Sequence, residues 1–272
     1  MSTPVPEGRG SRRDQVLVAA GVATVVATYL TLVGWRPGGL DALSGPAAGV
    51  ALVGNLTGAV LLLLGTVRRL PTSTLVLVPS AIAVNVAVGQ LVAVVGLPLY
   101  LDSIGTIVVA VLGGPAAGMA TGILANLIWG VTLAPVAVPF SVSAATIGAL
   151  AGLAARLGAF RRIWLAPLAG VLTGAAAAVV SAPVAAFVFG GVTGGGASAV
   201  VAAFRALGSS LLTATTLQGL LQDPLDKAIT FTVAALVLGG LPARLWRRFP
   251  FARRYATLQT TGRRPRPVSP PR

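Results

Sequence analysis

Only twelve charged side chains lie in the apolar body, residues 15–243, and four of them are best suited to chemistry. These four are Asp102 in one segment and Asp223, Asp226 and Lys227, the chain's single lysine, in another. Ionisable groups within long apolar segments are costly and usually functional. Carboxylates and an ammonium from two distant segments could together bind a polar small molecule. We therefore expect a ligand pocket where the two segments meet, at the outer end of the molecule.

Uncharged side chains near these segments are further candidates. Tyr100 could form a wall of the pocket, although a tyrosine near a membrane interface more commonly anchors a helix among lipid headgroups. Asn126 could hydrogen-bond within a helix bundle or to a ligand, as could Asn85 and Gln218. Trp129 lies near a predicted helix end, which is typical of an interfacial tryptophan.

Helix capping is the alternative role for the acids. Asp223 precedes Pro224, which fits an N-cap followed by the first helical residue, and Asp226 then falls at the third position. Capping could be the whole role of Asp223, and Asp102 could cap its own helix. For Asp226 and Lys227 we favour a functional role. Lys227 could pair with Asp102 or Asp226, or contact an anionic ligand group.

Composition excludes several kinds of site. The chain contains no histidine and no cysteine, which excludes Cys/His metal sites, disulfides and histidine acid–base catalysis. No G-x-x-x-x-G-K-[ST] loop occurs, so ATP cannot be hydrolysed by that route. We expect no metal, no other cofactor and no catalytic residues. The sequence thus favours a binding protein over an enzyme.

The elements that must position these residues are membrane helices. Apolar residues make up 55% of the 272 residues, charged residues 10%, and the mean hydropathy is +0.88. A helix needs about 20 apolar residues to cross a bilayer, in which helices satisfy their own backbone groups. We predict an all-α, polytopic membrane helix bundle with about eight spans. They are 15–35, 48–67, 74–96, 101–113, 114–134, 141–155, 164–189 and 224–243.

Arginine placement predicts the orientation. The net charge is +14, and nine arginines lie in 244–272. Because cytoplasmic connections are enriched in basic residues, both termini are expected in the cytoplasm of a plasma-membrane protein. The segment 197–221 is then an outer-face or re-entrant helix rather than a ninth span. We read the first span as an uncleaved anchor, and 1–14 and 262–272 as disordered. The charge indicates topology in a lipid bilayer, not nucleic-acid binding.

Small residues recur at four-residue spacing in several spans. Such faces let membrane helices approach closely. We interpret the glycines as packing ridges within the bundle. The pair Ala83 and Ala87 could be another packing face or a flat docking face for a partner helix. The glycine ridges are Gly114, Gly118 and Gly122; Gly148 and Gly152; and Gly170 and Gly174.

Several short motifs, in their order and spacing, resemble the substrate-binding S components of energy-coupling factor (ECF) transporters. The likeness covers about 74–250, the six-helix core of such proteins, and leaves 15–67 as two additional helices. The motifs are Leu97-Pro-Leu-Tyr-Leu-Asp-Ser-Ile-Gly-Thr-Ile107, Leu112-Gly-Gly-Pro-Ala-Ala-Gly118, Gly122-Ile-Leu-Ala-Asn-Leu-Ile-Trp129, Asp223-Pro-Leu-Asp-Lys-Ala-Ile229 and Leu241-Pro-Ala-Arg244.

The resemblance implies a binding subunit for a vitamin or similar micronutrient taken up from outside. Such subunits associate with a membrane T component and a pair of cytosolic ATPase subunits, which drive the uptake. Ala83 and Ala87 match the family's A-x-x-x-A face for the T component, which favours docking over packing for this pair. The positions that match the family's outward-opening pocket are Asp102, Asn126, Asp223, Asp226 and Lys227.

Two other classes of function remain open on the sequence. The chain could be a stand-alone secondary transporter of a small polar solute, or a membrane sensor or scaffold that transports nothing. A proton-coupled carrier would more often place an acid near the bilayer midplane. The predicted spans place none of the acids there.

Overall fold

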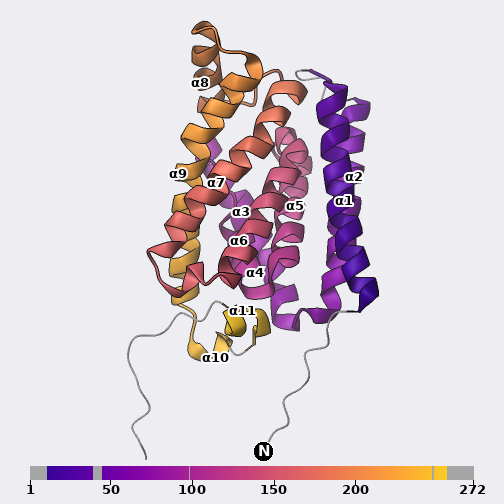
Figure 1. Ribbon diagram of the computed structural model, residues 1–272, viewed down its shortest axis with the longest axis vertical. Coiled ribbons are helices and arrows are strands. Elements are labelled where there is room, and N and C mark those ends of the chain that lie inside the picture. Colours follow the sequence, from indigo (N-terminus) through magenta and orange to yellow (C-terminus); the bar gives the residue numbers. More distant parts are fainter. Residues whose placement is uncertain (1–10, 39–44, 98, 247, 256–272) are drawn as a thin grey trace, which may run out of the picture.

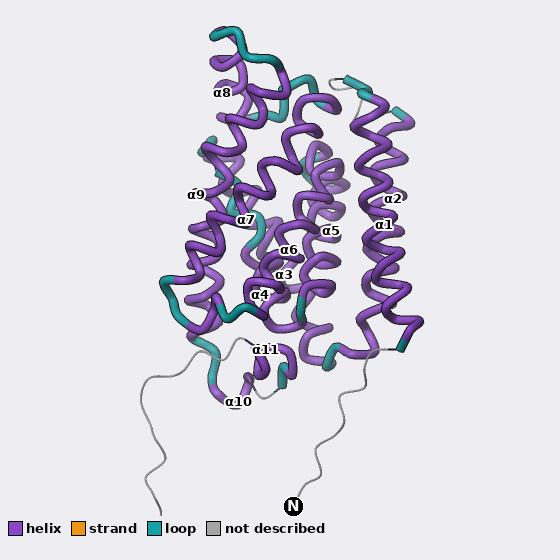
Figure 2. Tube along the Cα trace, viewed as in Figure 1, coloured by secondary structure: helices purple, strands orange, loops and turns teal. Residues whose placement is uncertain are grey.

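The computed structural model describes residues 11–38, 45–97, 99–246 and 248–255, and the regular elements within these ranges are all helices (Figures 1 and 2). The all-α prediction is therefore confirmed for the described part. A hairpin of two helices stands beside a larger bundle. The hairpin is α1 (Arg12–Trp35) and α2 (Pro46–Thr66). The bundle comprises α3 (Thr72–Val95), α4 (Ile104–Gly113), α5 (Pro115–Thr132), α6 (Ser141–Arg156), α7 (Leu165–Pro183), α8 (Gly195–Ala206) and α9 (Leu211–Gly239).

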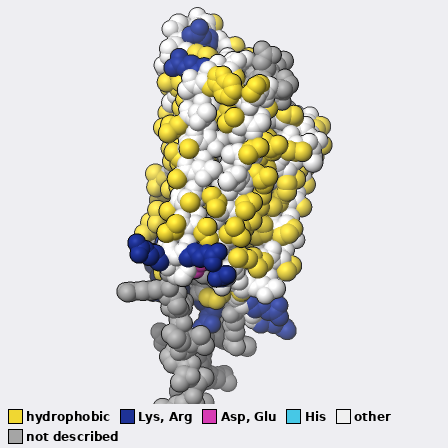
Figure 3. Space-filling model, turned by 90° about the vertical axis from the view of Figure 1, so that its right-hand side faces the viewer, with side chains coloured by type: hydrophobic (Ala, Val, Ile, Leu, Met, Phe, Trp, Pro, Cys, Tyr) yellow, Lys and Arg dark blue, Asp and Glu magenta, His cyan; other side chains and the backbone are white. Residues whose placement is uncertain are grey.

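Five helical segments of the described chain are long and apolar enough to cross a membrane. Hydrophobic side chains cover the flank of the molecule, and basic side chains gather at its two ends (Figure 3). This surface is that of a multi-pass membrane protein. α4, with 10 residues, is only about 15 Å long. The five segments are Arg12–Trp35, Pro46–Thr66, Thr72–Val95, Pro135–Arg156 and Leu165–Val188.

α9 is continuous where the sequence predicted a helix start. Pro224 was expected to open the last span after Asp223, but it lies in the interior of α9. A proline there removes one backbone hydrogen bond. α7 packs tightly along this stretch, because Gly170 and Gly174 bring its backbone against that of α9. The predicted 197–221 segment is therefore divided between α8 and the first turns of α9.

Close glycine contacts join the other helices of the bundle. Gly118 of α5 lies against Gly148 of α6, and Gly152 lies against Pro115. A Cβ atom at Gly148 would come within 2.3 Å of the Gly118 backbone. The predicted packing ridges are confirmed except for Gly114, which is the N-cap of α5 and lies against Phe251 of α11 (Pro250–Tyr255). The α1–α2 hairpin is closed in the same way, where Gly21 faces the Gly58 carbonyl.

The described part of the basic segment 244–272, residues 244–246 and 248–255, is folded against the bundle. Two short helices, α10 (Ala243–Trp246) and α11 (Pro250–Tyr255), lie at the same end of the bundle as the start of α1 (Figure 1). Phe249 and Ala252 are buried against the bundle, and the Arg161 guanidinium donates to the Tyr255 carbonyl at 3.1 Å. Apolar burial therefore holds this basic segment.

The predicted disorder of residues 1–14 is wrong for residues 11–14, which belong to α1 and its cap. Ser11 caps α1: its hydroxyl accepts from the Asp14 amide, and the Asp14 carboxylate accepts from the Ser11 amide. Such a reciprocal cap satisfies amides that the helix itself leaves unpaired. The rest of the predicted disordered termini, 1–10 and 262–272, lies outside the described residues.

Candidate ligand-binding site

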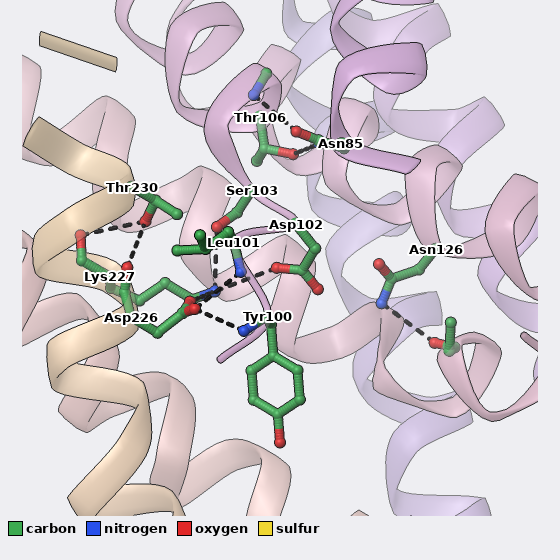
Figure 4. A network of polar contacts seen from close by, with 12 residues as sticks. Asn85, Tyr100, Leu101, Asp102, Ser103, Thr106, Asn126, Asp226, Lys227 and Thr230 are labelled. Carbon is green, nitrogen blue, oxygen red and sulfur yellow. Dashed lines mark hydrogen bonds and ion pairs between the residues drawn. The ribbon is translucent and has the colours of Figure 1, made fainter. Parts of the chain in front are cut away.

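Lys227 is the centre of a polar network inside the bundle (Figure 4). Its Nζ lies 2.6 Å from Asp226 Oδ2 and 3.3 Å from Asp102 Oδ1, and it donates to Ser103 Oγ at 3.1 Å. Lys227 and Asp226 are buried, with exposed fractions of 3% and 0%. Both pairings that the sequence offered for Lys227, with Asp102 and with Asp226, are thus present together.

Asp226 also fixes the connection between α3 and α4. Its Oδ1 accepts hydrogen bonds from the Tyr100 and Leu101 amides, each at 2.8 Å. Leu101 has a φ of +49°, in the left-handed region that costs a branched residue about 1–2 kcal/mol. The two hydrogen bonds hold this backbone in place, so α9 determines the shape of the loop that carries Tyr100 and Asp102.

Asn85 positions the start of α4. Its Nδ2 donates to Thr106 Oγ1 at 2.8 Å, and its Oδ1 accepts from the Gly105 amide at 2.7 Å. Gly105 lies directly on the backbone of Ala81 in α3, where a Cβ would come within 2.1 Å of the Ala81 carbonyl oxygen. This contact leaves room for glycine alone, and it places Ser103 against Lys227.

A cavity of about 290 Å³ lies beside the network. It extends from the middle of the bundle towards the end that carries α8, because residues 96–97, 193–194 and 196–197 also line it. Its volume is near the lower limit for small-molecule sites. Its charged and aromatic lining residues are Asp102, Asp223, Lys227, Tyr100, Trp129 and Phe140, and its polar ones include Asn126, Ser143, Ser181, Thr215, Gln218 and Gln222.

The structure brings most of the predicted site residues to this cavity. Asp226 does not line it, and instead supports the loop and Lys227 from behind. Asn126 donates from Nδ2 to the Ala137 carbonyl at 3.1 Å, which ties α5 to the turn before α6. Ala83 and Ala87 lie elsewhere, exposed on the outer face of α3.

The capping alternatives for the acids are wrong. Asp223 lies in the interior of α9, whose N-cap is Ser210, thirteen residues earlier. Asp102 precedes Ser103, the N-cap of α4, and its carboxylate pairs with Lys227 instead. Asp226 is the sixteenth of the 29 residues of α9. Asp223 and Asp226 therefore lie midway along a helix rather than at its start.

Two features of the lining were not predicted. Trp129, interpreted as an interfacial residue, lines the cavity and donates from Nε1 to Gln90 Oε1 at 2.9 Å. Gln218 donates to Gln222 one turn further along α9. The i, i+4 spacing of the two glutamines was a readable signal, whereas nothing in the sequence pairs Trp129 with Gln90.

The arrangement is one for binding. It combines a cavity, aromatic side chains, amide side chains and a charged network fixed by backbone hydrogen bonds. Comparisons with protein-family models, curated proteins and solved structures found no match to this chain.

Proposed function

We propose that this chain is the substrate-binding subunit of an ECF-type importer, which takes up a vitamin or similar small organic micronutrient. The observation that carries the proposal is the polar cavity within α3–α7 and α9, the six helices whose motifs resemble an S component. The α1–α2 hairpin is then an addition to that core. In this proposal the chain crosses the plasma membrane about eight times, with both termini cytoplasmic.

The closed lower end of the bundle supports a role that needs a partner. Below Lys227, Phe160 and Phe231 stack with their centroids 5.7 Å apart, and Phe249 joins the same buried cluster. A ligand in the cavity meets this apolar layer and α11 on the way to the other side. Release therefore requires a large movement of the subunit, which in an importer of this class is driven through the T component and the ATPases.

The outer face of α3 is the surface where we expect the T component to dock. Ala83 and Ala87 are exposed, one turn apart, and remote from the cavity. Small side chains let a second membrane helix approach the backbone closely. α1 offers a matched control, because Ala19 and Ala23 are also exposed at the same spacing.

Co-purification tests this proposal. We would express the tagged chain with a T component and ATPase pair, and measure the recovered complex and uptake of the co-purifying small molecule. Ala83→Leu is expected to abolish the complex and leave ligand binding intact, whereas Ala23→Leu retains both. A complex that survives Ala83→Leu but is lost in Ala23→Leu would place docking on α1. A wild-type chain that binds neither subunit contradicts the proposal.

A proton-coupled secondary transporter is the second candidate. It is favoured by one observation, the burial of Asp226 and Lys227 midway along α9. Ionisable pairs at that depth are typical of proton relays. Uptake by the purified chain alone, driven by a pH gradient and lost in Asp226→Asn, would favour this candidate over the first.

A further inference from the structure

Asp223 is the one acid of the site whose carboxylate makes no hydrogen bond and no ion pair within the described residues. It is 7% exposed and lines the cavity. Within the described residues, no hydrogen bond or ion pair joins its carboxylate to another group, whereas Asp102 and Asp226 both lie within 4 Å of Lys227 Nζ. A buried carboxylate without a partner is strongly unfavourable.

The position of Asp223 is rigid. Gly174 of α7 packs directly against the Asp223 backbone, since a Cβ added at Gly174 would lie 2.3 Å from the Asp223 carbonyl oxygen. The carboxylate therefore cannot withdraw from the cavity by a shift of α9. Lys227, one turn further along, is held away by its contacts with Asp226, Asp102 and Ser103.

The surrounding lining suits a planar cation. The lining carries two carboxylates, Asp102 and Asp223, and one ammonium, Lys227, which is already paired with Asp226 behind it; no other basic side chain lines the cavity within the described residues. Tyr100, Trp129 and Phe140 provide aromatic faces, which attract cations. Gln218 donates to Gln222, which leaves the Gln222 amide hydrogens available to a ligand.

We propose that the substrate is a small organic cation whose N–H groups bind the Asp223 carboxylate against the aromatic wall. This inference rests on the proposed function for its role in uptake. Binding itself is a property of the chain alone, and can be measured without the T component or the ATPases.

Three near-isosteric probes that differ in charge test the inference. Benzamidine is a cation with a fork of N–H donors, benzamide is neutral, and benzoate is an anion. We would measure their affinities by calorimetry for the purified full chain in lipid nanodiscs. Benzamidine is expected to bind about tenfold or more tightly than benzamide, because hydrogen bonds to charged groups are the stronger ones. Benzoate is expected to bind weakest.

Variants of Asp223 locate the effect. Asp223→Asn is expected to abolish the preference for benzamidine over benzamide, and Asp223→Glu to retain part of it. Asp14→Asn, the same chemical change in α1, is expected to leave the preference intact. The wild-type comparison tests the preference for a cation even if Asp223→Asn fails to fold, and Asp223→Glu then tests the role of Asp223.

Several outcomes overturn the inference. These are equal or weaker binding of benzamidine than of benzamide, no binding of any probe, or a preference that persists in Asp223→Asn. If sodium chloride raises the stability of the wild-type protein but not of Asp223→Asn, and benzamidine does not bind, the site would be assigned to an inorganic cation instead. If the preference holds but uptake proves independent of the ATPases, only the proposed function fails.

Discussion

Asp226→Asn is the substitution whose consequence the structure defines most sharply. The new side chain has nearly the same shape, and its oxygen can still accept from the Tyr100 and Leu101 amides. Its NH₂ group, however, would face the Lys227 ammonium 2.6 Å from the present Oδ2. Two donors then point at one another in a fully buried position. Lys227 keeps only Asp102, at 3.3 Å, and Ser103.

The magnitude follows from these contacts. Removing one partner of a buried ion pair typically costs about 3–5 kcal/mol. We expect a loss near the lower limit, about 3 kcal/mol, because two hydrogen bonds and the second acid remain. Replacing both groups, in Asp226→Asn with Lys227→Met, should recover part of this loss, since no uncompensated ammonium remains. Asp223→Asn should not destabilise the protein, because its carboxylate has no partner to lose.

Unfolding of the purified protein by sodium dodecyl sulfate in mixed micelles, followed by circular dichroism, measures these differences. Our reasoning predicts the order wild type, then the double variant, then Asp226→Asn, from most to least stable. An Asp226→Asn variant as stable as wild type would refute it, because the pair would then contribute nothing to the fold. A double variant less stable than the single one would contradict the assigned role of Lys227.

Three further substitutions test other parts of the account. Gly174→Ala should destabilise the protein by about 1–3 kcal/mol through overpacking, whereas Gly49→Ala, whose new Cβ would lie in open space, should be neutral or stabilising in the same unfolding assay. Asn85→Leu should cost about 1–3 kcal/mol by leaving the Gly105 amide without its acceptor; unchanged stability would show that water replaces it. Ligand binding should change the tryptophan fluorescence, and Trp129→Phe should abolish that change; a signal that persists would place the ligand elsewhere.

The helical class and the close-packing glycines were predictable, because both follow from local patterns. Long apolar runs indicate helices in lipid, and glycines one turn apart form a flat ridge wherever a second helix meets them. Gly118 and Gly148 meet as such ridges do. The sequence also identified Lys227 and its two carboxylate partners, since so few charged groups lie in the apolar body.

The start of the last helix was not predictable from local sequence. Asp223-Pro224 satisfies the rules for a helix N-terminus, and the same residues can occupy a helix interior when a neighbouring helix packs along them. That neighbour is α7, which is separated from α9 in the sequence by α8. The same error moved the acids from the middle of a helix to its end. Trp129 and Gln90 were missed because contacts between distant positions leave no spacing to read.

Transport by reconstituted protein tests the central claim most directly. The purified chain would be reconstituted in liposomes alone, or together with a T component and the ATPase pair. The radiolabelled form of its co-purifying ligand would then be added outside the liposomes. The account predicts accumulation only when all subunits and ATP are present, and bound ligand without accumulation for the chain alone. Accumulation by the chain alone, unaffected by ATP and driven by an ion gradient, would contradict it.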